Sequence, residues 1–251
     1  MLRTEISDGI VRYRFPPHEG RHFGFNLIAL LDDSTRRTLL LDTGYEEHAS
    51  AVLRDLAERG YTLRTVVLSH FHPDHVLGLR ALPKVELLGS PRYEETLQGY
   101  GPRDEWAEFI PSLTPGEDTS IQFGPFCLRF QPAPGHSPCS HYTLINGKFV
   151  HVADNVMTSN DGHDILPWAA FEDVPDHIAS LERLRSSLDR TFLLSHGLEL
   201  DDRAVKEAAI ANRVRYFRNV LKSNGRAPYE EATVGCRCEF LHQEWLIRKD
   251  D

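Results

Sequence analysis

The sequence lacks long apolar runs. Its longest, such as Asn26 to Leu31 and Thr65 to Leu68, fall far short of the roughly 20 residues that a membrane-spanning helix needs. The first residues, Met1 to Glu5, also lack the basic and then apolar pattern of a secretory signal. We therefore expect a cytoplasmic protein with no membrane-spanning segment.

Cysteine and basic residues are also scarce. Four cysteines in 251 residues are too few for a disulfide scaffold, so we expect free thiols. Lys and Arg number 28 against 37 Asp and Glu, a net charge of −9, and no cluster of basic residues suits a nucleic-acid backbone. We therefore expect a small-molecule substrate and neither a nucleic acid nor a membrane as partner. The oligomeric state stays open, with a homodimer among the alternatives.

The order of the elements predicts one layered α/β domain. Charged residues make up 26% and hydrophobic residues 41% of the chain, which is ordinary for a globular protein. Short β-rich runs bounded by turn residues predict strands at Phe25 to Leu31, Arg37 to Leu41, Thr65 to Leu68, Val85 to Leu88, Cys127 to Gln131, Tyr142 to Ile145, Phe149 to Ala153 and Thr191 to Leu194. An Asn146-Gly147 turn joins two of them.

Helical spacing of apolar residues predicts helices at Glu46 to Arg59, about Asp176 to Leu188, and about Arg203 to Lys222. Residues Tyr93 to Asp118 have no firm periodicity, which is typical of an insertion or loop. Alternating strands and helices favour helices outside two packed sheets. The expected domain spans residues 1–251, with a C-terminal helical extension from about residue 202.

The strongest chemical signal is Ser69-His70-Phe71-His72-Pro73-Asp74-His75, directly after a predicted strand. In extended chain, positions i and i+2 point to the same side, so His70 and His72 can share one cation. A helix starting after Pro73 would turn Asp74 and His75 toward a second cation. Imidazoles and carboxylates favour zinc, with iron or manganese as alternatives, and the lack of a nearby cysteine cluster favours a catalytic rather than a structural site.

The pattern His-x-His-x-Asp-His after an apolar strand resembles the signature of the metallo-β-lactamase fold superfamily. Later parts of that signature follow in order: Pro134-Gly135-His136-Ser137, Ala153-Asp154-Asn155 and Ser195-His196-Gly197. Upstream, Leu40-Leu41-Asp42-Thr43-Gly44 matches its early strand and turn. The resemblance covers roughly Phe25 to Gly197 and implies a four-layer αββα sandwich.

The resemblance also implies the roles of the matching residues. His70, His72 and His136 would bind one metal ion, and Asp74, His75 and His196 a second, with Asp154 bridging the two. Two zinc ions lower the pKa of a bridging water from 15.7 to roughly 7, which makes it a hydroxide nucleophile near neutral pH. Asp74 would also orient that hydroxide. Asp42 would either fix a ligand histidine or cap a turn.

Several other residues remain secondary candidates. His141 and His163 could contact substrate, although satisfied or solvated histidines are more common. Residues Met157 to Phe171, including Trp168, could shape the pocket or simply pack. Cys236 and Cys238, with His242, have a spacing unlike that of structural zinc sites, which favours ordinary packing.

Within the resembled family, the full ligand set favours a glyoxalase II-like or lactonase-like hydrolase of a small-molecule ester, thioester or lactone. Met157 stands where the lactonases carry a tyrosine, and residues 222–251 show no basic motif of the glutathione-thioester hydrolases. Two other functions stay open: a mononuclear iron dioxygenase acting on persulfides, and a non-catalytic binding module that retains the fold. The substrate, the native metal and the roles of Cys236 and Cys238 stay open as well.

Overall fold

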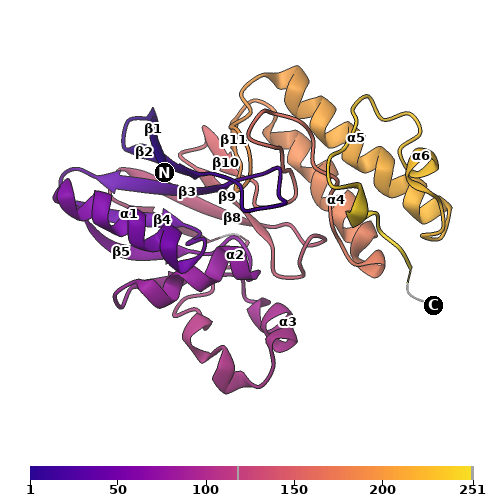
Figure 1. Cartoon of the computed structure of the whole chain (residues 1–251). Coiled ribbons are helices and arrows are strands. Elements are labelled where there is room, and N and C mark those ends of the chain that lie inside the picture. The colour runs from indigo at the N-terminus through magenta and orange to yellow at the C-terminus, as the bar shows by residue number, and fades with distance from the viewer. Residues whose placement is uncertain (118, 250–251) are drawn as a thin grey trace.

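The computed structural model describes residues 1–117 and 119–249 and contains a six-stranded and a five-stranded sheet (Figure 1). The six-stranded sheet runs in spatial order through β1 (Leu2–Ser7), β2 (Ile10–Phe15), β3 (Phe25–Asp32), β4 (Arg37–Leu41), β5 (Thr62–Val67) and β6 (Glu86–Leu88). Neighbours from β1 to β4 are antiparallel, whereas β4–β5 and β5–β6 are parallel. Parallel strands need a crossover, and helix α1 (Glu46–Glu58) supplies the one between β4 and β5.

The second sheet has one parallel pair, β10–β11, and is otherwise antiparallel. Its spatial order is β11 (Thr191–Leu193), β10 (Phe149–His151), β9 (His141–Ile145), β8 (Phe126–Pro132) and β7 (Ser120–Phe123). Asn146 and Gly147 have φ values of 51° and 64°, the left-handed conformation that a two-residue hairpin turn requires. This turn confirms the one expected between β9 and β10.

Successive side chains of the central strands point to opposite faces of their sheet and so pack into different parts of the core. The core has three such packed interfaces. On β3, Leu27 and Ala29 join the core beneath α1, whereas Ile28 and Leu30 join the core between the sheets, as the two-residue period of a strand dictates. On the second sheet, Phe192 packs toward the outer helices and Leu193 toward the first sheet. Three interfaces make four layers, which confirms the αββα sandwich.

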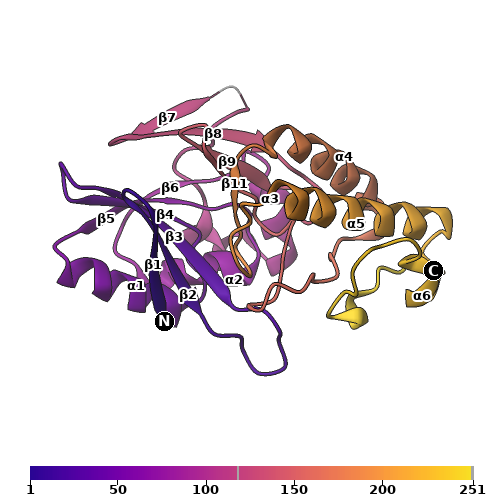
Figure 2. The same ribbon diagram turned by 90° about the horizontal axis from the view of Figure 1, so that it is seen from above.

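Helices α4 (Val174–Leu184) and α5 (Arg203–Lys222) form the outer layer on the second sheet, on the opposite flank from α1 (Figures 1 and 2). The remaining helices are the short α2 (Pro73–Val76), α3 (Tyr93–Leu97) and α6 (Tyr229–Ala232). Helix α5 has the bounds expected from its sequence and is capped at its N-terminus by the Asp202 carboxylate. Within residues 1–117 and 119–249, no helix has the length and hydropathy that crossing a bilayer would require.

Apart from shifts of a few residues at the ends of elements, the structure differs from the sequence prediction mainly in three places. Strands β1, β2 and β7 were not expected; β2 escapes notice because Arg12 and Arg14 interrupt its apolar pattern, yet Arg12 is buried and paired with Glu199. The strand expected to reach Ala153 ends at His151. Residues 93–117 form α3 and several 3₁₀ turns, and Trp106 and Phe109 anchor them in the core beneath α1; Asp118, the last residue of the expected loop, lies outside the described residues.

Candidate metal centre

The predicted site residues meet at one edge of the sandwich, where neighbouring strands end. His70 follows β5, Asp154 follows β10 and His196 follows β11, while His136 lies on the loop from β8 to β9. Helix α2 begins at Pro73, a residue well suited to the first helical position, and carries Asp74 and His75. The fold thereby brings together all the residues that the sequence analysis selected as ligands.

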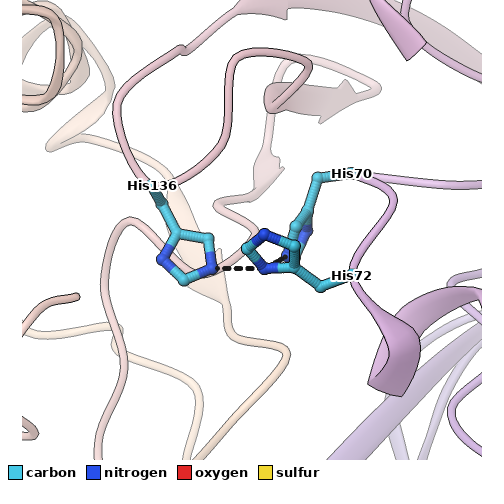
Figure 3. A group of neighbouring side chains, drawn as sticks. All are labelled: His70, His72 and His136. Carbon is cyan, nitrogen blue, oxygen red and sulfur yellow. Dashed lines mark hydrogen bonds between the residues drawn. The ribbon is translucent and has the colours of Figure 1, made fainter. Parts of the chain in front are cut away.

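The first group of side chains consists of His70, His72 and His136. Their rings converge from two separate loops (Figure 3). The Nδ1 atom of His72 lies 3.1 Å from His70 Nε2 and 3.0 Å from His136 Nε2. Burial lowers the pKa of all three imidazoles, to about 3 for His72. Three neutral ring nitrogens that converge in this way would bind a single cation more favourably than they would hydrogen-bond to one another.

The second group consists of Asp74, His75, Asp154 and His196. Asp154 Oδ2 lies 3.4 Å from His75 Nε2 and 3.3 Å from His196 Nε2. The same oxygen lies 3.5 Å from His136 Nε2 and 3.9 Å from His70 Nε2. The Asp154 carboxylate is therefore placed between the two groups.

Hydrogen bonds on the outer side of the rings define which nitrogen faces inward. His75 Nδ1 donates to Asp42 Oδ2 at 2.9 Å, His136 Nδ1 to the Trp168 carbonyl at 3.0 Å, and His196 Nδ1 to the Gly24 carbonyl at 2.8 Å. Carboxylates and carbonyls only accept, so each Nδ1 carries a proton and the Nε2 atom of the neutral ring is free. Such outer contacts are typical of metal-binding histidines.

Charge around the second group favours a cation. Burial alone would lower the pKa of His75 and His196, but the neighbouring carboxylates raise it, to about 10 for His196. Burial would likewise raise the pKa of Asp154, but the two imidazoles hold it well below its usual value. Among the described residues, His75 Nε2, His196 Nε2 and Asp154 Oδ1 are buried without a hydrogen-bond partner. Divalent cations would satisfy both the free donor atoms and the excess negative charge, so these residues fit a metal pair.

Asp42 is a positioning residue for this centre. It is 2% exposed and follows β4, and its carboxylate accepts hydrogen bonds from the Ser69 backbone at 2.7 Å and the Ser69 hydroxyl at 2.8 Å as well as from His75. Burial would raise the pKa of Asp42, but His75 beside it lowers it below the usual value. Of the two roles considered for Asp42, the structure supports the contact with His75, a candidate ligand.

The turn that carries Asp42 is in close backbone contact with the segment that follows helix α2. The Gly78 N–H donates to the Gly44 carbonyl at 2.7 Å, and a Cβ on Gly78 would collide with the Thr43 carbonyl. Only glycine fits there, so the Asp42 turn sits directly against the helix that carries Asp74 and His75.

We expect Asp42→Asn to weaken metal binding at the second group by about 10- to 100-fold, because the His75 ring loses its charged acceptor. Competition with a chromogenic chelator measures this affinity. The matched control is Asp33→Asn, whose side chain is 76% exposed. Equal affinities in the two variants would remove Asp42 from the positioning role.

The geometry agrees with a sequence match that covers most of the chain. The sequence profile of the Metallo-beta-lactamase superfamily matches residues 23–196. The chain belongs to this superfamily.

Curated members of the superfamily resemble the chain over part of their length. A hydroxyacylglutathione hydrolase from Photorhabdus laumondii is 28% identical over 55% of this chain and 50% of its own length. An atrochrysone carboxyl ACP thioesterase from Pseudocercospora fijiensis is 26% identical over 75% of this chain and 53% of its own length. The chain thus spans about half the length of these relatives.

The superfamily fold is also seen in solved structures. A metallo-beta-lactamase from Pontibacter korlensis superposes with a TM-score of 0.66 at 17% identity, covering 87% of this chain and 99% of that protein. At this identity the likeness shows a shared fold.

The two groups open into a pocket of about 540 Å³, a size typical of small-molecule sites. Asp74, Asp154, His72 and His136 lie at its metal end, and the wall is formed by His18, Glu19, Arg21, Phe23, Phe25, Tyr45, Met157, Trp168 and Trp245. Sequence analysis singled out only Met157 and Trp168 among these wall residues. The others come from the β2–β3 loop, the first residue of β3, the residue before α1 and the C-terminal segment, where no motif marks them.

The other secondary candidates lie outside the lining of this pocket. His141 is 4% exposed and lies beside a separate small cavity, and His163 is exposed on the loop after Asp154. All four cysteines are free, and Cys236 and Cys238 pack against the core of the second sheet. His242 stacks on Trp245 with ring centres 4.5 Å apart, which makes it part of the support of the pocket wall.

A third group, His18, Glu47 and His48, gathers near the pocket rim. His48 Nδ1 accepts the Tyr45 backbone N–H at 3.4 Å, so the neutral ring carries its proton on Nε2 and offers no free nitrogen. We assign no metal to this group.

Proposed function

We propose that this chain is a metal-dependent hydrolase that cleaves a small-molecule ester, thioester or lactone with the help of two zinc ions. The observation that carries the proposal is the pair of ligand groups on either side of Asp154, at the end of a pocket large enough for such a substrate. Iron or manganese would suit the same donors.

When bound, the two cations supply Lewis acidity and a nucleophilic hydroxide drawn from water near neutral pH. The chain's own residues set the geometry. Asp154 holds the two groups at a fixed spacing, and the outer acceptors Asp42, Gly24 and Trp168 keep the imidazoles in the tautomer that leaves Nε2 free.

Asp74 is the candidate for orienting the attacking water. Its side chain is 22% exposed, whereas that of Asp154 is 5% exposed, and it reaches the pocket from the start of α2. Although burial would raise its pKa, His75 and His196 hold the pKa of this carboxyl below its usual range. An ionised carboxylate beside the pocket accepts a proton or a hydrogen bond from water.

Thioesters are the first substrates to test. A thioesterase appears among the curated relatives, and Met157 stands where the resembled lactonases carry a tyrosine. The intact second group, Asp74, His75 and His196, supports a dinuclear centre over the mononuclear iron dioxygenase and over a binding module that has lost catalysis.

The deciding experiment measures metal content by elemental mass spectrometry on protein purified without added metal, together with turnover of ester, thioester and lactone panels. We expect about two zinc ions per chain and turnover that a chelator abolishes and zinc restores. One iron per chain with persulfide oxidation and no hydrolysis would replace the proposal by the dioxygenase. A folded protein with no metal and no turnover would replace the proposal by the non-catalytic binding module.

A further inference from the structure

A second hollow, which we call the side groove, adjoins the pocket over the metal centre. The side groove has a volume of about 340 Å³ and is lined by residues 168–172 and residues 244–248. Trp168 and Trp245 line both the pocket and the side groove. The two hollows therefore meet at these two tryptophans.

Trp168 is held by contacts with the first ligand group. Its carbonyl accepts a hydrogen bond from His136 Nδ1, and its indole centre lies 5.9 Å from the His136 ring and 6.0 Å from the His72 ring. Trp168 is nevertheless 46% exposed. A large aromatic surface held open beside a catalytic centre is typical of a ligand-binding wall.

Trp245 is fixed from the opposite side. Its ring stacks on His242, and the Arg21 guanidinium lies 5.2 Å above it. His242 Nε2 accepts the His22 backbone N–H at 3.2 Å. The C-terminal segment is thus tied to the β2–β3 loop, and Trp245 is held in place by contacts from both segments.

The charges of the side groove disfavour an anionic occupant. Its two carboxylates are Glu172 and Glu244, and the hydrogen bond from His242 lowers the pKa of Glu244, which keeps it ionised. Against these two carboxylates, the groove lining carries one cation, Arg248, which donates to the Ala227 carbonyl at 2.6 Å, so the net charge of the lining is negative. Phe171, Leu246 and Ile247 supply apolar surface beside the two indoles.

We propose that the substrate is a thioester or ester with an uncharged, extended acyl chain, and that this chain passes between Trp168 and Trp245 into the side groove. The inference rests on the proposed hydrolase function. Each methylene that enters the side groove adds apolar burial. Chain length beyond the two tryptophans therefore sets the specificity of the enzyme.

The test compares kcat/KM of the zinc-loaded enzyme on N-acetylcysteamine thioesters from acetyl to decanoyl. We expect kcat/KM to rise about two- to fourfold for each methylene added between hexanoyl and decanoyl. Ala170 is exposed and lines the side groove, so Ala170→Trp fills it. This variant should lower the decanoyl-to-acetyl ratio about tenfold.

The matched control is Ala208→Trp, an exposed alanine on α5, which should leave the ratio unchanged; circular dichroism checks that both variants fold. Turnover that is equal for all acyl chains, or an equal ratio in the two variants, would overturn the inference and leave the hydrolase function standing. A rate that instead rises when the thiol is lengthened from N-acetylcysteamine to pantetheine would place the thiol arm in the side groove. Absence of turnover on every thioester and on the matching acyl esters would overturn the inference, and absence of turnover on lactones as well would overturn both proposals.

Discussion

Replacing Asp154 by alanine is expected to remove most of the bound metal and to lower kcat/KM by about 100-fold or more. Its Oδ2 atom lies within 3.9 Å of ring nitrogens from both ligand groups, so one substitution affects both metal positions. Loss of a hydrogen-bond partner behind a metal ligand already lowers metal affinity or activity by about 10- to 100-fold. Loss of Asp154, which lies between both groups, should lower them further. Elemental mass spectrometry and thioester turnover on the same preparation measure both effects.

The matched control for Asp154→Ala is Asp161→Ala, an exposed aspartate on the same loop, which should keep its metal and its rate. His72→Ala should lose metal at the first group in the same way. Full activity in either ligand variant would sink the proposed centre.

Arg213→Met is expected to lower the free energy of unfolding by about 3–5 kcal/mol, because it leaves a buried polar network without its cation. Arg213 is fully buried on α5. Its guanidinium donates to Asp164 Oδ1 at 2.6 Å, to the Ala209 carbonyl at 3.0 Å and to the Met157 carbonyl. Through these contacts α5 holds the loop that follows Asp154. Urea unfolding followed by circular dichroism measures the change.

Arg218→Met provides the comparison on the same helix. Its side chain is 63% exposed and pairs with Glu182 at 3.0 Å, and an exposed pair of this kind is worth about 0–1 kcal/mol. If both variants unfold at the same urea concentration, Arg213 is not a structural link between α5 and the metal loop.

His70, His72, Asp74 and His75 could be selected from the sequence because their geometry is local. His70 and His72 follow a strand and alternate in extended chain, and Pro73 marks the first residue of α2. His136, Asp154 and His196 lie far apart in the sequence, and only the family resemblance assigned them to the site. The order of apolar runs predicted helices outside two packed sheets from the period of a strand or a helix, and the resemblance implied the four-layer sandwich.

The pocket wall and the edge strands could not be obtained in this way. Arg21 and Trp245 lie more than two hundred positions apart, and only tertiary packing brings them together. In β2, the buried Arg12 is tolerated because Glu199, close to β11, pairs with it. Long-range partners of this kind override local patterns, since a buried charge is acceptable only where a distant residue neutralises it.

The superfamily profile begins at residue 23 and ends at His196, whereas His18, Glu19, Arg21 and Trp245 of the pocket wall all lie outside that span. Part of the pocket wall is thus encoded outside the stretch that carries the candidate ligands, although Phe23, Phe25, Tyr45, Met157 and Trp168 lie within it. Substitutions in the β2–β3 loop or at the C-terminus can alter which molecule is accepted while every ligand residue stays in place. Substrate choice in this fold can therefore diverge between relatives that keep the same chemistry.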